Sequence, residues 1–134
     1  MINLEVMTSE VAKVAKEAGA YLRESQHTFN TATITSKSLN ALVSEVDRNA
    51  EKLIVDRLQG LFPEAGFLTE EETTKQATDL EYTWVIDPLD GTTNFIHGLP
   101  IYSVSLALLH HGWPVIGVVY EIGMDECFTA FKNG

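Results

Sequence analysis

The sequence predicts an α+β protein in which two N-terminal helices pack on an antiparallel sheet. Up to residue 61 the apolar residues recur with helical spacing, whereas beyond Pro63 they alternate or form short runs. The chain has 134 residues, of which 45% are hydrophobic and 21% charged, enough for one packed core and too few residues for two ordinary domains. We therefore treat residues 1–134 as a single unit.

The first predicted helix covers residues 3–27. Its apolar residues recur at spacings of three and four, as on the buried face of an amphipathic helix. They are Leu4, Met7, Val11, Val14, Ala18 and Tyr21. The alternating stretch Thr31–Thr35 that follows predicts a short strand or an extended arm.

The second predicted helix covers residues 44–61. Ser44 is its expected N-cap, and Asp47 at the third helical position completes a variant of the capping box. The apolar face of this helix is formed by Val46, Ala50, Leu53, Ile54, Leu58 and Leu61. Pro63 ends the helix because proline cannot continue its hydrogen bonding.

The second half of the chain predicts short strands separated by turns. We expect strands at residues 67–68, 84–86, 102–109, 115–120 and 127–131. The turns at residues 110–112 and 123–125 are short, so the last three strands should form an antiparallel meander. Large and small residues alternate in residues 102–109, which predicts one buried face.

The charge balance argues against one large class of function. Nine Lys and Arg residues against nineteen Asp and Glu residues give a formal net charge of −10, the opposite of the clustered cations that bind nucleic acids. No apolar stretch reaches membrane-spanning length, and the N-terminus lacks the basic start of a signal peptide. The single cysteine, Cys127, excludes an internal disulfide. We therefore expect a cytoplasmic protein that binds neither nucleic acids nor membranes.

Acidic residues concentrate between residues 70 and 90, where seven of the nineteen lie beside one base, Lys75. Asp87 differs from a solvated loop residue because it ends an apolar strand, and Asp90 follows it across a Pro-Leu turn. The two side chains can converge at the edge of the sheet, where their repulsion calls for a hard divalent cation. The alternative is an Asx-type turn in which Asp90 only caps the segment that begins at Thr92.

The residues that follow Asp90 predict an anion site beside this cation. Gly91 permits unusual backbone angles, and residues 91–95 predict a turn into a short helix. Free backbone N–H groups at the start of a helix attract an anion such as phosphate. A cation and an anion held by one short stretch indicate phosphoryl chemistry, and neither an EF-hand loop nor a P-loop motif is present.

The stretch WVIDPLDGTTNFIHGLP at residues 84–100 closely resembles the signature of the inositol monophosphatase family, which are Mg²⁺-dependent, lithium-sensitive phosphatases. Glu70-Glu71 resembles the paired glutamates that precede this signature, and residues 42–47 resemble the entry to the second helix of the family. The resemblance implies the N-terminal half of the layered α/β sugar-phosphatase fold. It also implies a small phosphate monoester as substrate, inositol monophosphate or a related sugar or polyol phosphate, and a homodimer or higher self-association.

The resemblance implies a role for each matching residue. The groups that would hold Mg²⁺ are the carboxylates of Glu70, Asp87 and Asp90 and the carbonyl oxygen of Leu89. Glu70 would also bridge metals or orient the attacking water, which makes it a catalytic residue. Thr92 would position that water and would itself be held by Asp47. The N–H groups of Gly91 and Thr92, beside Asp90, would bind the substrate phosphate.

The length of the chain bears on this assignment. Members of the family are about twice as long, and their second half supplies a further metal-binding aspartate and the sugar contacts. We therefore expect residues 1–134 to be the N-terminal, metal-binding half, with the C-terminal half absent. On their own, these residues should bind metal weakly and show little turnover. The alternatives are the fructose bisphosphatase or bisphosphate nucleotidase branch, or a non-catalytic, self-associating regulatory module, because half a domain should expose apolar surface.

Several histidines and phenylalanines are interpreted as structural or solvent-exposed residues and not as parts of the site. His97 follows the signature and is expected beside the site or at the surface. His110 and His111 lie in a predicted hairpin turn, where adjacent side chains should point apart and make a poor metal pair. Phe128 and Phe131, in the last predicted strand, are expected in the core.

Overall fold

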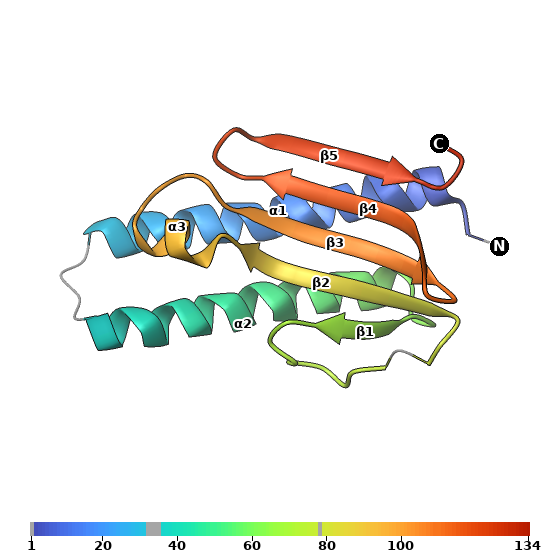
Figure 1. The fold of residues 1–134 in the computed structure, drawn as a ribbon, viewed down its shortest axis with the longest axis horizontal. Coiled ribbons are helices and arrows are strands. Elements are labelled where there is room, and N and C mark those ends of the chain that lie inside the picture. Colours follow the sequence, from blue (N-terminus) through green and yellow to red (C-terminus); the bar gives the residue numbers. More distant parts are fainter. Residues whose placement is uncertain (1, 32–35, 78) are drawn as a thin grey trace.

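The computed structural model describes residues 2–31, 36–77 and 79–134. Five strands form one sheet, and two long helices cover one of its faces (Figure 1). The elements are α1 (Leu4–Thr31), α2 (Ser36–Leu61), β1 (Gly66–Thr69), β2 (Tyr82–Asp90), α3 (Thr92–Ile96), β3 (Ser103–His110), β4 (Trp113–Glu121) and β5 (Glu126–Phe131). The predicted class, two helices packed on a mainly antiparallel sheet, is confirmed.

Helix α1 is longer than expected because it continues to Thr31. The side chains that it buries recur at spacings of three and four: Val11, Val14, Ala15, Ala18 and Leu22. Of the stretch Thr31–Thr35 expected to be extended, Thr31 ends the helix and residues 32–35 lie outside the described residues. No helix in the described part of the chain is long and apolar enough to cross a bilayer.

Helix α2 begins at Ser36, eight residues earlier than expected. Ser44 therefore lies inside the helix, and the prediction that it forms an N-cap with Asp47 in a capping box is wrong. Residues 36–43 contain neither Gly nor Pro, and Leu39 and Val43 both contact the core. Packing of this extended apolar face favours the helix over the additional turns.

The five strands lie side by side in the order of the sequence. β1 pairs with β2 in parallel, and the long connection at residues 70–81 supplies the crossover that parallel pairing requires. β2 to β5 pair antiparallel, which confirms the predicted meander. The turn between β3 and β4 contains His111 and Gly112 with φ of 49° and 83°, the left-handed conformations of a tight two-residue hairpin turn.

The sheet has a buried face and an open face. The side chains buried under the helices include Trp84, Ile86, Val104, Leu106, Leu108, Ile116 and Val118. On the opposite face Leu68, Val119 and Phe128 are 43%, 40% and 59% exposed. The expectation that Phe128 lies in the core is therefore wrong. Phe131 packs against the core as expected, and Phe128, three positions earlier in an alternating strand, points to the other face.

Candidate metal centre

Asp87 and Asp90 lie on the same face of the sheet because β2 is irregular between them. Asp87 pairs with Ser105 and Asp90 pairs with Ser103, so three steps along β2 match two steps along β3. Residues three apart in a regular strand point to opposite faces, and the extra residue of a bulge returns the second one to the first face. Pro88 lies within this bulge, a position that tolerates its missing N–H. The pairing with β3 therefore places both residues on one face of the sheet within the strand, and not through a turn after it.

Asp47 of α2 is buried near four other carboxylates. Its pKa is raised to about 7, first by burial and then by the negative charges of Glu71, Asp87, Glu70 and Glu51. Its Oδ1 atom is buried and has no hydrogen-bond partner. A buried oxygen that lacks a donor and faces several negative charges either keeps a proton or lies close to a cation.

Asp87 experiences the same repulsion. Burial raises its pKa most, the charges of Asp90 and Glu70 raise it as well, and a hydrogen bond from the backbone N–H of Leu89 lowers it. Glu70 therefore lies close enough to affect the ionisation of Asp87, although it belongs to the loop after β1. The ligand oxygens of Glu70, Asp87 and Asp90 do not all lie within 4.8 Å of one another, as expected for carboxylates that repel.

The loop that follows β1 is fixed by Glu51 of α2, a residue that the sequence interpretation missed. Oε1 of this buried side chain accepts a hydrogen bond of 2.7 Å from the Glu71 N–H, and Oε2 accepts hydrogen bonds of 2.8 and 2.5 Å from the N–H and hydroxyl of Thr73. A signal was available in the sequence. Glu51 follows Asp47 by four residues and precedes Ile54 by three, so it is an acid on the buried face of a helix.

Gly91 is the N-cap residue of α3, as expected for a turn into a short helix. Its φ of 96° lies in the left-handed region, and a Cβ atom there would lie 3.0 Å from the Ile101 carbonyl oxygen and 3.2 Å from the Cα of Tyr102. Only glycine fits this position without strain. A pocket of about 240 Å³ lies beside it, and its polar lining comes from Asp90, Asn94, Ser103 and Glu121. Two carboxylates in this lining would repel a phosphate in the absence of a cation.

Thr92 is the first residue of α3, and its hydroxyl donates a hydrogen bond to the Leu89 carbonyl oxygen, 3.4 Å away. The expected hydrogen bond from Thr92 to Asp47 is not formed, and Asp47 Oδ1 has no partner. The physical reason is that a hydroxyl has one proton, and a carbonyl oxygen three residues earlier competes for it. The role of Thr92 in positioning a water stays a prediction.

Helix α3 is held in place by Gln26 of α1, a second residue that the sequence interpretation missed. Its Nε2 donates hydrogen bonds of 3.2 and 3.0 Å to the carbonyl oxygens of Phe95 and Leu99. Its Oε1 accepts a hydrogen bond of 3.1 Å from the Tyr102 hydroxyl. Gln26 follows the buried Leu22 by four residues, so its place on the buried face of the helix could have been noticed.

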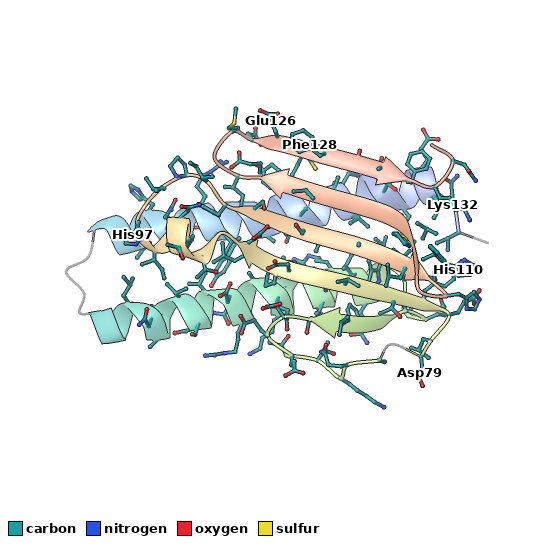
Figure 2. All side chains as sticks on the ribbon, in the orientation of Figure 1. Asp79, His97, His110, Glu126, Phe128 and Lys132 are labelled. Atoms are coloured by element: carbon teal, nitrogen blue, oxygen red, sulfur yellow. The ribbon has the colours of Figure 1, made fainter. Side chains whose placement is uncertain are left out.

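A different group of ligand atoms lies at the start of β2. Glu81, His110 and His111 each offer one ligand atom within 4.8 Å of the others, and no other His, Cys, Asp or Glu triplet does so among the described residues. Figure 2 shows His110 at the end of the sheet remote from α3 and from the exposed His97. The expectation that the two adjacent histidines point apart is wrong, because their ring centroids are 4.5 Å apart. The positive φ of His111 breaks the strand alternation that would have separated the rings.

Known proteins that resemble this chain identify its family. A model of the inositol monophosphatase family matches residues 3–134. The chain belongs to the inositol monophosphatase family. The inositol-1-monophosphatase of Mesorhizobium japonicum is 38% identical over 124 residues, which are 92% of this chain and 47% of that protein.

The relatives include a protein with a different name and solved structures. The Nus factor SuhB of Escherichia coli (strain K12) is 37% identical over 127 residues, which are 95% of this chain and 48% of that protein. The solved structure of an inositol monophosphatase from Anabaena (Nostoc) has a TM-score of 0.79 and 32% identity, and the match covers 97% of this chain and 45% of that one. The chain thus spans about half the length of the curated relatives that it matches.

The residues present fit the Mg²⁺ that the inositol monophosphatase family implies. The candidate donors are carboxylate and carbonyl oxygens, the ligands that this hard ion prefers. Burial and the neighbouring negative charges raise the pKa of Asp47 to about 7, and its buried Oδ1 atom has no hydrogen-bond donor. A nearby positive charge would relieve both effects.

Proposed function

We propose that this chain is the metal-binding half of a Mg²⁺-dependent phosphatase that hydrolyses inositol monophosphate or a related sugar or polyol phosphate. The observation that carries the proposal is the bulge in β2, which brings Asp87 and Asp90 to one face of the sheet, with Glu70 close enough to raise the pKa of Asp87. Membership of the inositol monophosphatase family and the name of the Mesorhizobium japonicum relative support this reaction class.

In this proposal the carboxylates of Glu70, Asp87 and Asp90 and the carbonyl oxygen of Leu89 hold Mg²⁺. When bound, the ion supplies an activated water and a positive charge for the phosphoryl oxygens. The chain contributes the geometry, because Asp87 and Asp90 project from a paired strand and not from a loop. Glu51 contributes as well, because its hydrogen bonds to Glu71 and Thr73 fix the loop that carries Glu70.

Thr92 and Gly91 would act on the water and the substrate. The Thr92 hydroxyl donates a hydrogen bond to the Leu89 carbonyl oxygen, so its own oxygen can accept a hydrogen bond from a water. The proposed pairing with Asp47 requires this hydroxyl to turn from Leu89 to the partnerless Oδ1 of Asp47. The N–H groups of Gly91 and Thr92 would then receive phosphate oxygens, with Asp90 beside them.

Metal binding and hydrolysis test this proposal together. We expect Mg²⁺ to raise the melting temperature of the chain, and we expect Asp87→Asn and Asp90→Asn to remove most of this rise. Asp79→Asn is the matched control, because Asp79 is exposed and lies far from α3 (Figure 2). A Mg²⁺ response that is absent in the wild type, or that Asp87→Asn leaves unchanged, would remove the metal centre from the proposal.

Phosphate release identifies the substrate class. Inositol 1-phosphate, fructose 1,6-bisphosphate and a nucleoside bisphosphate should be compared, because the fructose bisphosphatase and bisphosphate nucleotidase branches are the alternatives within this class. We expect little turnover from residues 1–134 and Mg²⁺-dependent hydrolysis of inositol 1-phosphate when the chain is extended to the length of its relatives. An extended, folded protein that binds Mg²⁺ and hydrolyses none of these compounds would contradict the phosphatase assignment.

The open face of the sheet favours a second candidate, a non-catalytic, self-associating regulatory module. The exposed apolar side chains of Leu68, Val119 and Phe128 lie on this face. A pocket of about 220 Å³ is lined there by residues that include Val85, Ala107 and the candidate metal ligand Asp87. A homodimer in which a second copy covers this face would remove apolar surface from water. The relative named Nus factor SuhB supports a regulatory role.

Sedimentation equilibrium separates the two candidates. We expect a homodimer or larger assembly that Phe128→Lys weakens. Val6→Lys is the control, because Val6 is similarly exposed but lies on α1. Assembly without Mg²⁺ binding favours the regulatory module, whereas a monomeric wild type would exclude it. The cytoplasmic location expected from the sequence stays a prediction.

A further inference from the structure

Glu81, His110 and His111 gather at the start of β2 and at the hairpin turn between β3 and β4. His110 Nε2 lies 3.0 Å from Glu81 Oε2, and His111 Nε2 lies 3.9 Å from the same oxygen. The three ligand atoms all lie within 4.8 Å of one another. We propose that these three residues form a second metal site, which binds a metal ion of intermediate hardness such as Zn²⁺.

The spacing of the ligand atoms fits such an ion. Zn²⁺ binds imidazole nitrogen and carboxylate oxygen at ~2.0–2.2 Å in a tetrahedral arrangement, which places neighbouring ligand atoms roughly 3.3–3.6 Å apart. The two distances from Glu81 Oε2, 3.0 and 3.9 Å, lie on either side of this range. Side-chain rotations that bring all three ligand atoms, now within 4.8 Å of one another, to this spacing would complete three of the four coordination positions.

The backbone around the site is already fixed. The His111 N–H donates a hydrogen bond of 2.8 Å to the Glu81 carbonyl oxygen, so the turn is tied to the start of β2. The His110 ring stacks on the ring of Tyr82, with centroids 4.4 Å apart and planes 13° from parallel. The left-handed backbone at His111 directs its ring to the same side. Preorganised ligands lose little conformational entropy on binding, which favours a specific site.

The ligand types select the metal. Two imidazoles and one carboxylate are a common donor set for Zn²⁺ in sites that keep one position open, whereas Mg²⁺ prefers oxygen donors. The side chains of His110, His111 and Glu81 are 36%, 68% and 60% exposed, so the fourth position is open to water or to a ligand from another molecule. Because two of the three ligands are imidazoles, the site should bind Zn²⁺ more tightly than Mg²⁺.

The proposed site is separate from the candidate Mg²⁺ centre. Glu81 directly precedes β2, and Asp87 is six residues further along the chain. At ~3.3 Å per residue in a strand, the two sites are roughly 20 Å apart. Each can therefore be disabled by mutation without touching the residues of the other.

Calorimetric titration with Zn²⁺ in excess Mg²⁺ tests the proposal, because Mg²⁺ then saturates oxygen-donor sites. We expect one Zn²⁺ per chain, and we expect His110→Ala or His111→Ala to weaken binding at least about tenfold. Glu81→Gln should weaken binding too, since it removes the anionic ligand. His97→Ala is the matched control, because this exposed histidine lies at the opposite end of the sheet (Figure 2).

Co²⁺ absorption and histidine NMR provide readouts that do not depend on activity. Co²⁺ should give the visible absorption of a tetrahedral site in the wild type and in Asp87→Asn, and not in His110→Ala. In the wild type, Zn²⁺ should shift the imidazole signals of His110 and His111 and leave those of His27 and His97 in place. Equal Zn²⁺ affinity in the wild type and in folded His110→Ala, loss of Zn²⁺ binding in Asp87→Asn, or unshifted His110 and His111 signals would overturn the proposal.

Discussion

At the scale of single residues, Asp47 shows what it costs in stability to bury a carboxyl group close to other negative charges. Its pKa of about 7 lies above the ordinary value of 3.8. Below pH 3.8 the carboxyl keeps its proton in both the folded and the unfolded chain. Between pH 3.8 and 7 the unfolded chain releases the proton while the folded chain retains it, so the stability of the folded state falls as pH rises. Above pH 7 the cost is complete, because the buried carboxylate is then ionised.

Asp47→Asn removes this cost. In the absence of divalent ions, we expect the variant to be more stable than the wild type by at most ~4 kcal/mol at pH 8, since the pKa rises from 3.8 to about 7 and one pKa unit corresponds to ~1.4 kcal/mol. At pH 4 the difference should nearly vanish. Urea unfolding at pH 4, 6 and 8 measures it, with Asp79→Asn as the exposed control. A variant that is less stable at pH 8, or a difference that does not grow with pH, would contradict the burial argument.

Gly91 tests the geometry at the start of α3. Gly91→Ala places a Cβ atom 3.0 Å from the Ile101 carbonyl oxygen at a φ of 96°. We expect a loss of ~1–3 kcal/mol in stability and weaker Mg²⁺ binding, because the bend beside Asp90 must shift. Gly60→Ala in α2 meets no atom within 4 Å and should stabilise the chain by ~0.5–1 kcal/mol. Melting curves of the two variants should therefore move in opposite directions.

At the scale of elements, the loop after β1 depends on one side chain of α2. Glu51→Ala leaves the N–H groups of Glu71 and Thr73 without their acceptor, and we expect a loss of ~2–4 kcal/mol in stability. Thr73→Val removes only the hydroxyl donor and should cost ~1 kcal/mol. Hydrogen exchange of the Glu71 and Thr73 amides should accelerate in Glu51→Ala before other amides respond. Uniform acceleration across the sheet would instead indicate global destabilisation.

The bulge in β2 is the element-scale feature on which the candidate centre depends. Without it, Asp87 and Asp90 would face opposite sides of the sheet, and Asp90 would point toward the helices. Gln26 of α1 and Glu51 of α2 hold the neighbouring segments, α3 and the loop after β1. Both long helices therefore support the centre from beneath the sheet, although the donors proposed for the metal all come from β2 and the loop after β1.

At the scale of the whole molecule, the order of the strands predicts that central strands resist local unfolding more than edge strands. β3 is paired on both sides and lies over α1, whereas β5 is an edge strand paired only with β4. We expect the amides of β3 to exchange slowest and those of β5 much faster, because an edge strand opens without disturbing the core. Hydrogen exchange measured by NMR provides the test, and equal protection of β3 and β5 would show that another surface covers the edge.

The sequence by itself determined the class of the fold, the meander and the signature of the inositol monophosphatase family. These features depend on local information: apolar residues spaced by three and four, alternation along strands, and short turns rich in Gly. The same local information placed Asp87, Asp90 and Gly91 in one short stretch. It could not predict that Asp90 lies on the same face of the sheet as Asp87, since the register against Ser103 and Ser105 is set by pairing with β3.

Only the tertiary structure decided where α2 begins, which buried acid fixes the loop after β1, and how His110 and His111 meet Glu81. The start of α2 follows from core contacts of Leu39 and Val43, which outweigh a local capping signal at Ser44. Glu51 meets residues twenty or more positions later in the chain, and Glu81 meets His110 twenty-nine positions later. Contacts at such separations depend on how the elements pack, and no local pattern of spacing encodes that packing.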